Sequence, residues 1–167
     1  MKLITSIEAI TRFAGLIAAL LVLPLIGALV TEVFSRYIFD SPTLWAFEIS
    51  YMVMGAIFML GLANALRLGQ HVSVDVVTLK LKPRATATIR SLCYLMFLPI
   101  VSWISLELYH YFYEAFDSGE RSGRSAWNPV MWPVYGVWFI GLAVLSLQVL
   151  AELLKSARIA LGHEVNV

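Results

Sequence analysis

The sequence contains four long windows without a charged residue. They are Phe13–Thr31, Ile49–Leu66, Ser91–Leu106 and Ser125–Ala151. A helix needs about 20 mainly apolar residues to cross the hydrocarbon layer of a bilayer, and each window reaches that length with its flanks. Because a backbone in lipid must satisfy its own hydrogen bonds, we predict four transmembrane helices.

A soluble bundle of four core helices is the alternative, but it requires a polar stripe at the helical period, and Leu16–Val30 has none.

Composition agrees with the membrane interpretation, since 60% of the 167 residues are hydrophobic and 14% are charged. A net charge of +1 provides no field to attract a polyanion, which argues against a nucleic-acid partner. The single cysteine, Cys93, cannot form an internal disulfide. We therefore predict an all-α fold, a single membrane domain over residues 1–167.

The distribution of basic residues predicts the orientation of this domain. We expect membrane-spanning helices at about residues 12–34, 42–66, 88–113 and 129–154. Nine of the 12 Lys and Arg residues lie on the side that holds both termini, so the positive-inside rule places both termini in the cytoplasm. Aromatic residues cluster around the two connections on the opposite side. The first apolar run is longer than that of a usual signal peptide and follows Glu8, so we expect it to be retained as an anchor.

Local signals refine the helix boundaries. Ser41 is a candidate N-cap with Pro42 at the first helical position, and Pro99 is expected to bend the third membrane helix. The segment of residues 72–83 is too polar to cross the membrane. It can be read as a strand or as an amphipathic helix ending at Pro83, and we favour a helix that lies on the lipids of the inner leaflet.

Charged side chains near the hydrocarbon layer mark candidate functional or structural positions. Glu32 and Arg36 have the spacing of an intrahelical salt bridge. Alternatively, Arg36 pairs with Glu48, which lies too deep in the second membrane helix to act as a cap, and so joins the first two helices. A single carboxylate such as Glu48 is a weak basis for an ion or proton site.

Two histidine and carboxylate pairs complete the set. Glu107 and His110 are three residues apart, and we expect an interfacial hydrogen-bonded pair rather than a proton relay. His71 and Asp75 are four apart and are expected to fix a turn, because two ligands do not make a metal site. The sequence shows no nucleophile elbow, zinc-protease motif or phosphate loop, so we expect neither an enzyme nor a cofactor.

An ordered set of weaker motifs points to a family. Arg36-Tyr37-x-Phe39 is followed by Trp45-x-x-Glu48, Phe58-x-x-Gly61-x-Ala63, Arg67 and His71-Val72-x-Val74-Asp75. This order resembles the DctQ-type small membrane subunit of tripartite ATP-independent periplasmic (TRAP) transporters, most closely from Thr31 to Asp75. The last two membrane helices match mainly in hydropathy.

The resemblance implies a three-part importer in the bacterial inner membrane. A periplasmic DctP-type protein captures an organic acid, and a large DctM-type membrane subunit carries it by an elevator motion driven by a sodium gradient. The small subunit packs beside the scaffold of the large subunit among membrane lipids, and we expect the large subunit to be a separate polypeptide.

The resemblance also suggests roles for individual residues. Arg36, Trp45 and Glu48 are expected to stabilise the outer half of the domain or its contact with the large subunit, and His71 and Asp75 to fix the inner turn. The charged residues of the second outer connection are candidates for docking the binding protein; these are Asp117, Glu120, Arg121 and Arg124.

Two other functions remain open from the residues alone. A four-span anchor subunit of a quinone or haem oxidoreductase could use Glu107 and His110. A small proton-coupled exporter could use Glu48.

Overall fold

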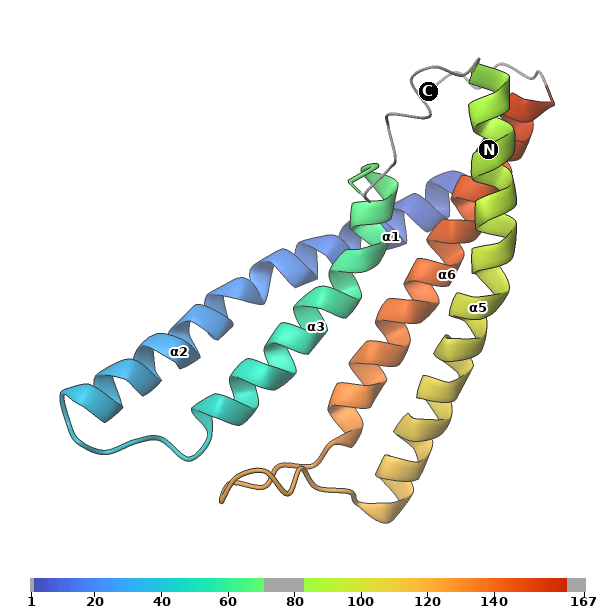
Figure 1. The fold of residues 1–167 in the computed structure, drawn as a ribbon. Coiled ribbons are helices and arrows are strands. Elements are labelled where there is room, and N and C mark those ends of the chain that lie inside the picture. The colour runs from blue at the N-terminus through green and yellow to red at the C-terminus, as the bar shows by residue number, and fades with distance from the viewer. Residues whose placement is uncertain (1, 71–82, 162–167) are drawn as a thin grey trace.

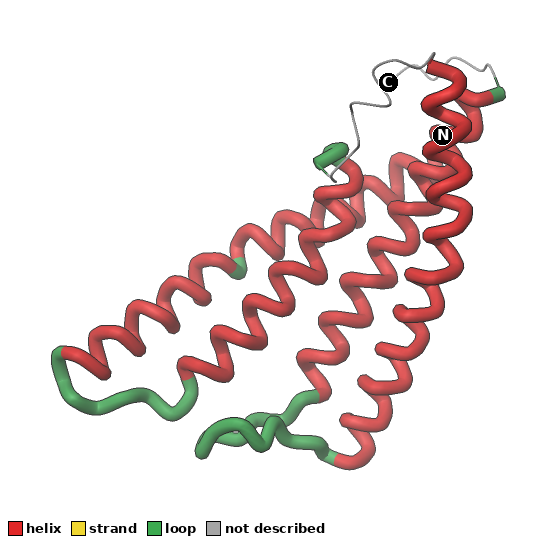
Figure 2. Tube along the Cα trace, viewed as in Figure 1, coloured by secondary structure: helices red, strands yellow, loops and turns green. Residues whose placement is uncertain are grey.

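The structure is a computed structural model that describes residues 2–70 and 83–161. Its helices are α1 (Lys2–Leu20), α2 (Val22–Tyr37), α3 (Ala46–Arg67), α5 (Pro83–Ser118) and α6 (Trp132–Ala160), joined by loops (Figure 2). Four stretches of these residues are long and apolar enough to cross a membrane, with α1 and α2 counted together as Leu3–Tyr37. The predicted all-α fold with four membrane-spanning helices is confirmed.

The membrane helices form an open row rather than a closed ring. In Figure 1, α2, α3, α6 and α5 follow one another from left to right, and α1 continues the line of α2 behind α3. Extensive contacts join α5 to α6, α6 to α3, and α3 to both α1 and α2, while α1 also reaches α6. Within the described residues, α5 therefore has one extensive neighbour and stands at an edge of the row.

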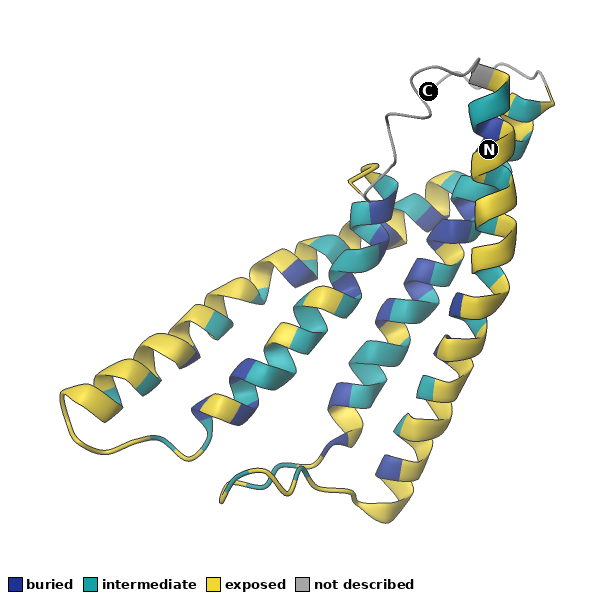
Figure 3. Ribbon diagram, in the orientation of Figure 1, coloured by how far each residue is buried: buried dark blue, intermediate teal, exposed yellow. Residues whose placement is uncertain are grey.

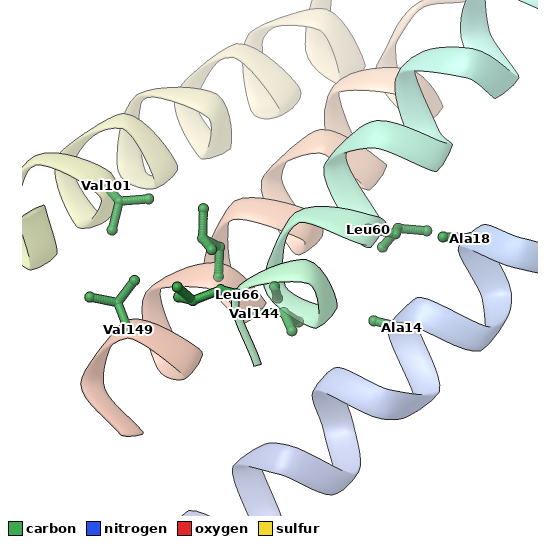
Figure 4. Close-up of a cluster of buried hydrophobic side chains, with 9 residues drawn as sticks. Ala14, Ala18, Leu60, Leu66, Val101, Val144 and Val149 are labelled. Atoms are coloured by element: carbon green, nitrogen blue, oxygen red, sulfur yellow. The ribbon is translucent and has the colours of Figure 1, made fainter. Parts of the chain in front are cut away.

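The core of the row lies on α6. Its buried face includes Val144, Leu145 and Val149, which pack with Leu60 and Leu66 of α3. Figure 4 shows part of this cluster, with Ala14 and Ala18 of α1 on one side and Val101 of α5 on the other, and Figure 3 shows that burial is concentrated on α6 while α2 and α5 are mostly exposed. Since the exposed residues of the edge helices are largely apolar, these faces are suited to lipid or to another membrane protein.

Glycine allows α3 and α6 to approach closely. A Cβ atom at Gly141 of α6 would lie 2.6 Å from the backbone oxygen of Met59 in α3. On the other side of α3, a Cβ atom at Gly15 of α1 would lie 2.6 Å from the side chain of Asn64. Small residues permit such close packing where lipid supplies no hydrophobic drive between helices.

The first predicted span lies within a longer helical segment that is broken once. The chain is helical from Lys2 to Tyr37 except at Leu21, which separates α1 from α2. Pro24 explains the break, because proline has no N–H to donate to Leu20 and its ring crowds that carbonyl. By contrast, Pro99 lies within α5 without ending it.

Two predicted helix boundaries need correction. The helix predicted to start at Ser41 and Pro42 begins instead at Ala46, with Trp45 at the N-cap position. Ser41 is held in the preceding turn, where its N–H donates to the carbonyl of Ser35 (2.9 Å). The third membrane helix, expected from about residue 88, begins at Pro83, a position that suits proline because the first helical N–H needs no partner. The interfacial segment predicted for residues 72–83 otherwise lies outside the described residues.

Candidate functional site

A network of polar side chains joins α1 to α6 where α1 begins and α6 ends, here called the terminus end. Thr11 Oγ1 donates to Gln148 Oε1 (2.9 Å), and Gln148 Nε2 donates to Glu152 Oε1 (2.8 Å). Lys155 Nζ then bonds to Glu152 (2.8 Å) and to Glu8. Thr11 and Gln148 are fully buried, so these bonds fix the register of α1 against α6.

The sequence analysis missed this network. Glu8 entered only as an argument against signal cleavage, and Gln148 stood in a window counted as free of charge. The signal was nevertheless present, because Gln148, Glu152 and Lys155 recur at spacings of four and three on one helix face. Their partners on α1 are about 140 residues away in sequence, and no local pattern identifies them.

The opposite end of the row carries the two connections of residues 38–45 and 119–131, here called the loop end. In the first connection, Arg36 Nε donates to Glu32 Oε1 (2.9 Å), so the intrahelical alternative for this pair is the one observed. The other carboxylate oxygen of Glu32 accepts from the backbone N–H of Thr43 (3.0 Å) and from its hydroxyl. Glu32 thereby ties the end of α2 to the residues that lead into α3.

Glu48 does not pair with Arg36. Its side chain is buried, and Oε1 accepts a hydrogen bond from the Ser122 hydroxyl in the second connection. Its Oε2 atom is also buried and has no hydrogen-bond partner among the described residues. The proposed pairing of the first two helices through Arg36 and Glu48 is therefore wrong, because Arg36 points along its own helix to Glu32. Glu48 instead ties a distant loop to α3.

The second connection is an ordered loop. The N–H of Met131 donates to the carbonyl of Glu120 (2.9 Å), and the N–H of Ser122 donates to that of Pro129 (3.0 Å). At the tip, the N–H of Gly123 donates to Asn128 Oδ1 (2.8 Å), and Gly123 has a φ of +63°, which favours glycine. These bonds close a hairpin-like turn, and the Ser122 hydroxyl ties it to Glu48 of α3.

The four residues predicted to dock a binding protein all lie at the loop end, and all are exposed. Three of them already make internal contacts. Arg121 Nη1 donates to the carbonyl of Asn128 (3.1 Å), Glu120 accepts from the Tyr135 hydroxyl (3.3 Å), and the Arg124 guanidinium lies 4.6 Å from the centre of the Tyr51 ring. Asp117 lies in the last turn of α5.

Aromatic residues cluster near the loop end, as the sequence predicted, and the structure shows that their rings fill the α5–α6 interface there. Tyr109 packs on Phe139 with ring centres 5.4 Å apart, and Phe116 packs edge-on against Trp132 at 5.7 Å. Glu107 accepts from Trp103 Nε1 (3.1 Å), so its partner is this indole and not the predicted His110. His110 instead lies edge-on to Tyr109, at 6.0 Å.

The remaining predicted positions are Trp45, which is half-buried at the start of α3, and His71 and Asp75, which lie outside the described residues. Among the residues that the structure describes, no group of three His, Cys, Asp or Glu side chains could hold a metal ion. The observed polar contacts join helices to helices and loops to helices. This arrangement suits a structural component rather than a catalytic centre.

Comparison with known proteins agrees with this interpretation. Residues 25–159 match the family described as tripartite ATP-independent periplasmic transporters, DctQ component. A stretch of 58 residues is 33% identical to the sialic acid TRAP transporter permease protein SiaT of Haemophilus influenzae (strain 86-028NP), covering 35% of this chain and 9% of that protein. No solved structure matches the chain. Since the family match covers most of the sequence, the chain belongs to the DctQ component family of TRAP transporters, and it is a multi-pass membrane protein of a transport system rather than an enzyme.

Proposed function

We propose that the chain is the small membrane subunit of a TRAP importer and acts as a fixed brace beside a large DctM-type subunit. The observation that carries this proposal is the way its polar side chains are used. The buried Thr11 and Gln148 bond to each other and hold α1 against α6 at the terminus end, and the partly buried Glu32 holds Thr43 at the loop end. A transport path requires polar groups that are free to bind a solute, whereas a brace requires groups that hold helices in place.

The transport cycle assigned to the assembly rests on family membership. We propose that the large subunit moves an organic acid with a sodium gradient in the bacterial inner membrane, and that this chain remains stationary. The matched permease is named for sialic acid, which is a carboxylic acid and so supports the substrate class. The anchor role in an oxidoreductase is not retained, since the family is one of transporters.

We propose that the terminus end faces the cytoplasm and the loop end the periplasm. The excess of basic residues on the terminus side supports this orientation. The exposed loop-end residues Asp117, Glu120, Arg121 and Arg124 then face the soluble binding protein. Glu120 and Arg121 are already hydrogen-bonded to Tyr135 and Asn128, so Arg124, whose guanidinium lies over the Tyr51 ring, is the better candidate for direct contact.

Uptake by reconstituted vesicles tests the function directly. Vesicles with the large subunit, the binding protein and this chain should accumulate the organic acid when a sodium gradient is applied. Vesicles that lack only this chain should not, and vesicles that contain only this chain should accumulate nothing. Uptake by this chain alone, or full uptake without it, would refute the proposed role as a brace.

Assembly provides a second test. Glu48→Ala removes the tie between α3 and the second connection and should reduce the amount of large subunit that copurifies with the chain. Charge reversal at Arg124 should change the salt dependence of uptake without changing this copurification, since exposed charges mainly affect encounter rates.

A further inference from the structure

The edge helix α5 packs through one narrow stripe. Most of the buried or half-buried residues recur at alternating spacings of four and three along the helix, on the side packed against α6; they are Ala87, Ser91, Tyr94, Leu98, Val101, Ser105, Leu108, Phe112 and Ala115, while Ala85, Thr86 and Ser102 are half-buried outside this repeat. This is the repeat of a coiled-coil seam. The opposite face of α5 therefore points away from every helix with which the described chain packs extensively.

That opposite face has the same repeat and an unexpected composition. Cys93, Met96, Ile100, Trp103, Glu107, His110, Glu114 and Asp117 follow one another at spacings of three and four, and all eight are exposed. We call these eight residues the outward stripe. Its half nearer the terminus end is apolar, and its half nearer the loop end carries three carboxylates and a histidine.

Glu107 lies at membrane depth. Counted from Arg90, the last basic residue of α5, about 20 residues of helix cross the hydrocarbon layer and reach His110. Glu107 is about one helical turn inside that limit. A carboxylate facing lipid there is costly, and the neutral indole of Trp103 supplies a single hydrogen bond to it.

Among the described residues, no Lys or Arg side chain forms an ion pair with this stripe. Glu107, Glu114 and Asp117 form no ion pair with any described residue, and the nearby Arg121 and Arg124 are directed to Asn128 and to the Tyr51 ring. On this face of α5, the three acidic residues from Glu107 to Asp117 therefore lack a Lys or Arg partner among the described residues.

The exposed face of α2, at the other edge of the row, is different. Its large exposed residues are aliphatic or aromatic, among them Leu23, Ile26, Val30 and Val33, and its one acid, Glu32, is paired with Arg36. Lipid tails alone can cover such a face, because it carries no unpaired charge. The exposed face of α5 therefore requires a positively charged partner, whereas the exposed face of α2 does not.

We propose that the outward stripe of α5 is the surface that docks on the large membrane subunit, and that the large subunit brings a Lys or Arg side chain to Glu107. This inference rests on the proposed function and adds the contact face. A soluble binding protein could reach Asp117 but not Trp103 or Glu107, which the count from Arg90 places within the hydrocarbon layer. A membrane partner with a matching cation satisfies the stripe along its whole length.

The single cysteine provides the test, because Cys93 is exposed on the stripe. The full-length chain is coexpressed with its cognate large subunit, labelled at Cys93 with benzophenone maleimide in native membranes and irradiated. The matched control is Cys93→Ala with Ile26→Cys, which moves the probe to the exposed face of α2. We expect a crosslink to the large subunit from Cys93 and none from the control.

Other outcomes overturn the inference. Crosslinks to the large subunit only from position 26 would place the contact on α2, and a product of twice the mass of this chain would show self-association through α5. Crosslinks only to lipid would show that the stripe faces the bilayer. In each case, copurification of the unlabelled wild-type chain with the large subunit reports separately whether the proposed function holds.

Substitution of Glu107 gives an independent measurement. If Glu107 faces lipid, Glu107→Leu should leave the yield of copurified large subunit unchanged or higher. If it pairs with a cation of the large subunit, the yield should fall about tenfold or more, since breaking one buried charge pair changes an affinity by at least that factor. Glu107→Asp should retain most of the yield, and Ile26→Ala on α2 should have no effect. An undiminished yield for Glu107→Leu would refute the ion pair.

Discussion

The terminus end and the loop end of this protein are held together by different means. At the terminus end, side chains of α1 bond directly to side chains of α6, through Thr11 to Gln148 and Glu8 to Lys155. At the loop end, the polar side-chain bonds run from a helix to a connection, through Glu32 to Thr43 and Glu48 to Ser122. In Figure 1 the helix row is also wider at the loop end, where α2 and α5 stand far apart.

This difference separates two mechanical roles. Direct bonds between helices fix their relative position, so their loss should change the stability of the whole row. A bond from a helix to a loop fixes the loop, so its loss should alter a surface and leave the helix row intact. The predictions below test this distinction, first in the shared middle of the molecule and then at each end.

We expect the largest loss of stability at the close contact between Gly141 of α6 and the Met59 backbone of α3. Gly141→Leu places side-chain atoms against the Met59 backbone, where even a Cβ atom would lie at 2.6 Å, and α3 and α6 must separate. Overpacking of this kind costs about 3 kcal/mol or more when backbone must move. The unfolding midpoint in detergent should fall sharply. Gly27→Leu on α2 is the matched control, since a Cβ atom there meets nothing within 4 Å, and an equal loss in both variants would contradict the close contact.

Lys155→Met tests the terminus end. It leaves the carboxylates of Glu8 and Glu152 without their shared cation. Since all three side chains are partly exposed, we expect a loss of about 2 kcal/mol in stability, between the values for exposed and buried pairs. Thermal unfolding in detergent measures the loss. Arg158→Met, an exposed cation one turn further along α6, should behave like wild type, and equal losses would show that net charge rather than the network matters.

The sequence predicted the features that depend on local composition. The charge-free windows identified four membrane helices because a spanning helix is recognised by length and hydropathy alone. The aromatic clustering near the loop end was also found, since Tyr109, Phe116 and Trp132 are visible as ring-rich flanks. The break at Leu21 was predictable but overlooked, because Pro24 stands within an otherwise uniform apolar run.

The sequence could not show which residues far apart in the chain contact each other. Glu48 was paired with Arg36 because they are neighbours in sequence, yet the structure brings Ser122 to Glu48 across 74 residues. Gln148 was given no role from the sequence, because its partner Thr11 is 137 residues away. The outward stripe of α5 has a readable period, but only the packing of α5 against α6 shows which of its faces is left open.

At the loop end, Glu48→Ala should free a surface without loosening the helix row. Loss of the bond to Ser122 removes a tie between the loop of residues 119–131 and α3. Trypsin should then cleave more rapidly at Arg121 and Arg124 in the purified protein, while the unfolding midpoint changes less than in Lys155→Met. Ser122→Ala breaks the same bond from the other side and should match it. Unchanged cleavage in both variants would show that the loop is held by its own backbone bonds.

The smallest effect is expected from Arg36→Gln, at the exposed side of the same end. The Arg36 side chain is 55% exposed, so water and salt already screen its attraction to Glu32. Glu32 also keeps its bonds to Thr43, which hold α2 to the start of α3. The unfolding midpoint should therefore equal that of wild type at low and at high salt, whereas Thr43→Val should lower it slightly. A fall in Arg36→Gln as large as in Lys155→Met would show that charge pairs stabilise both ends alike, and the distinction between helix ties and loop ties would then be lost.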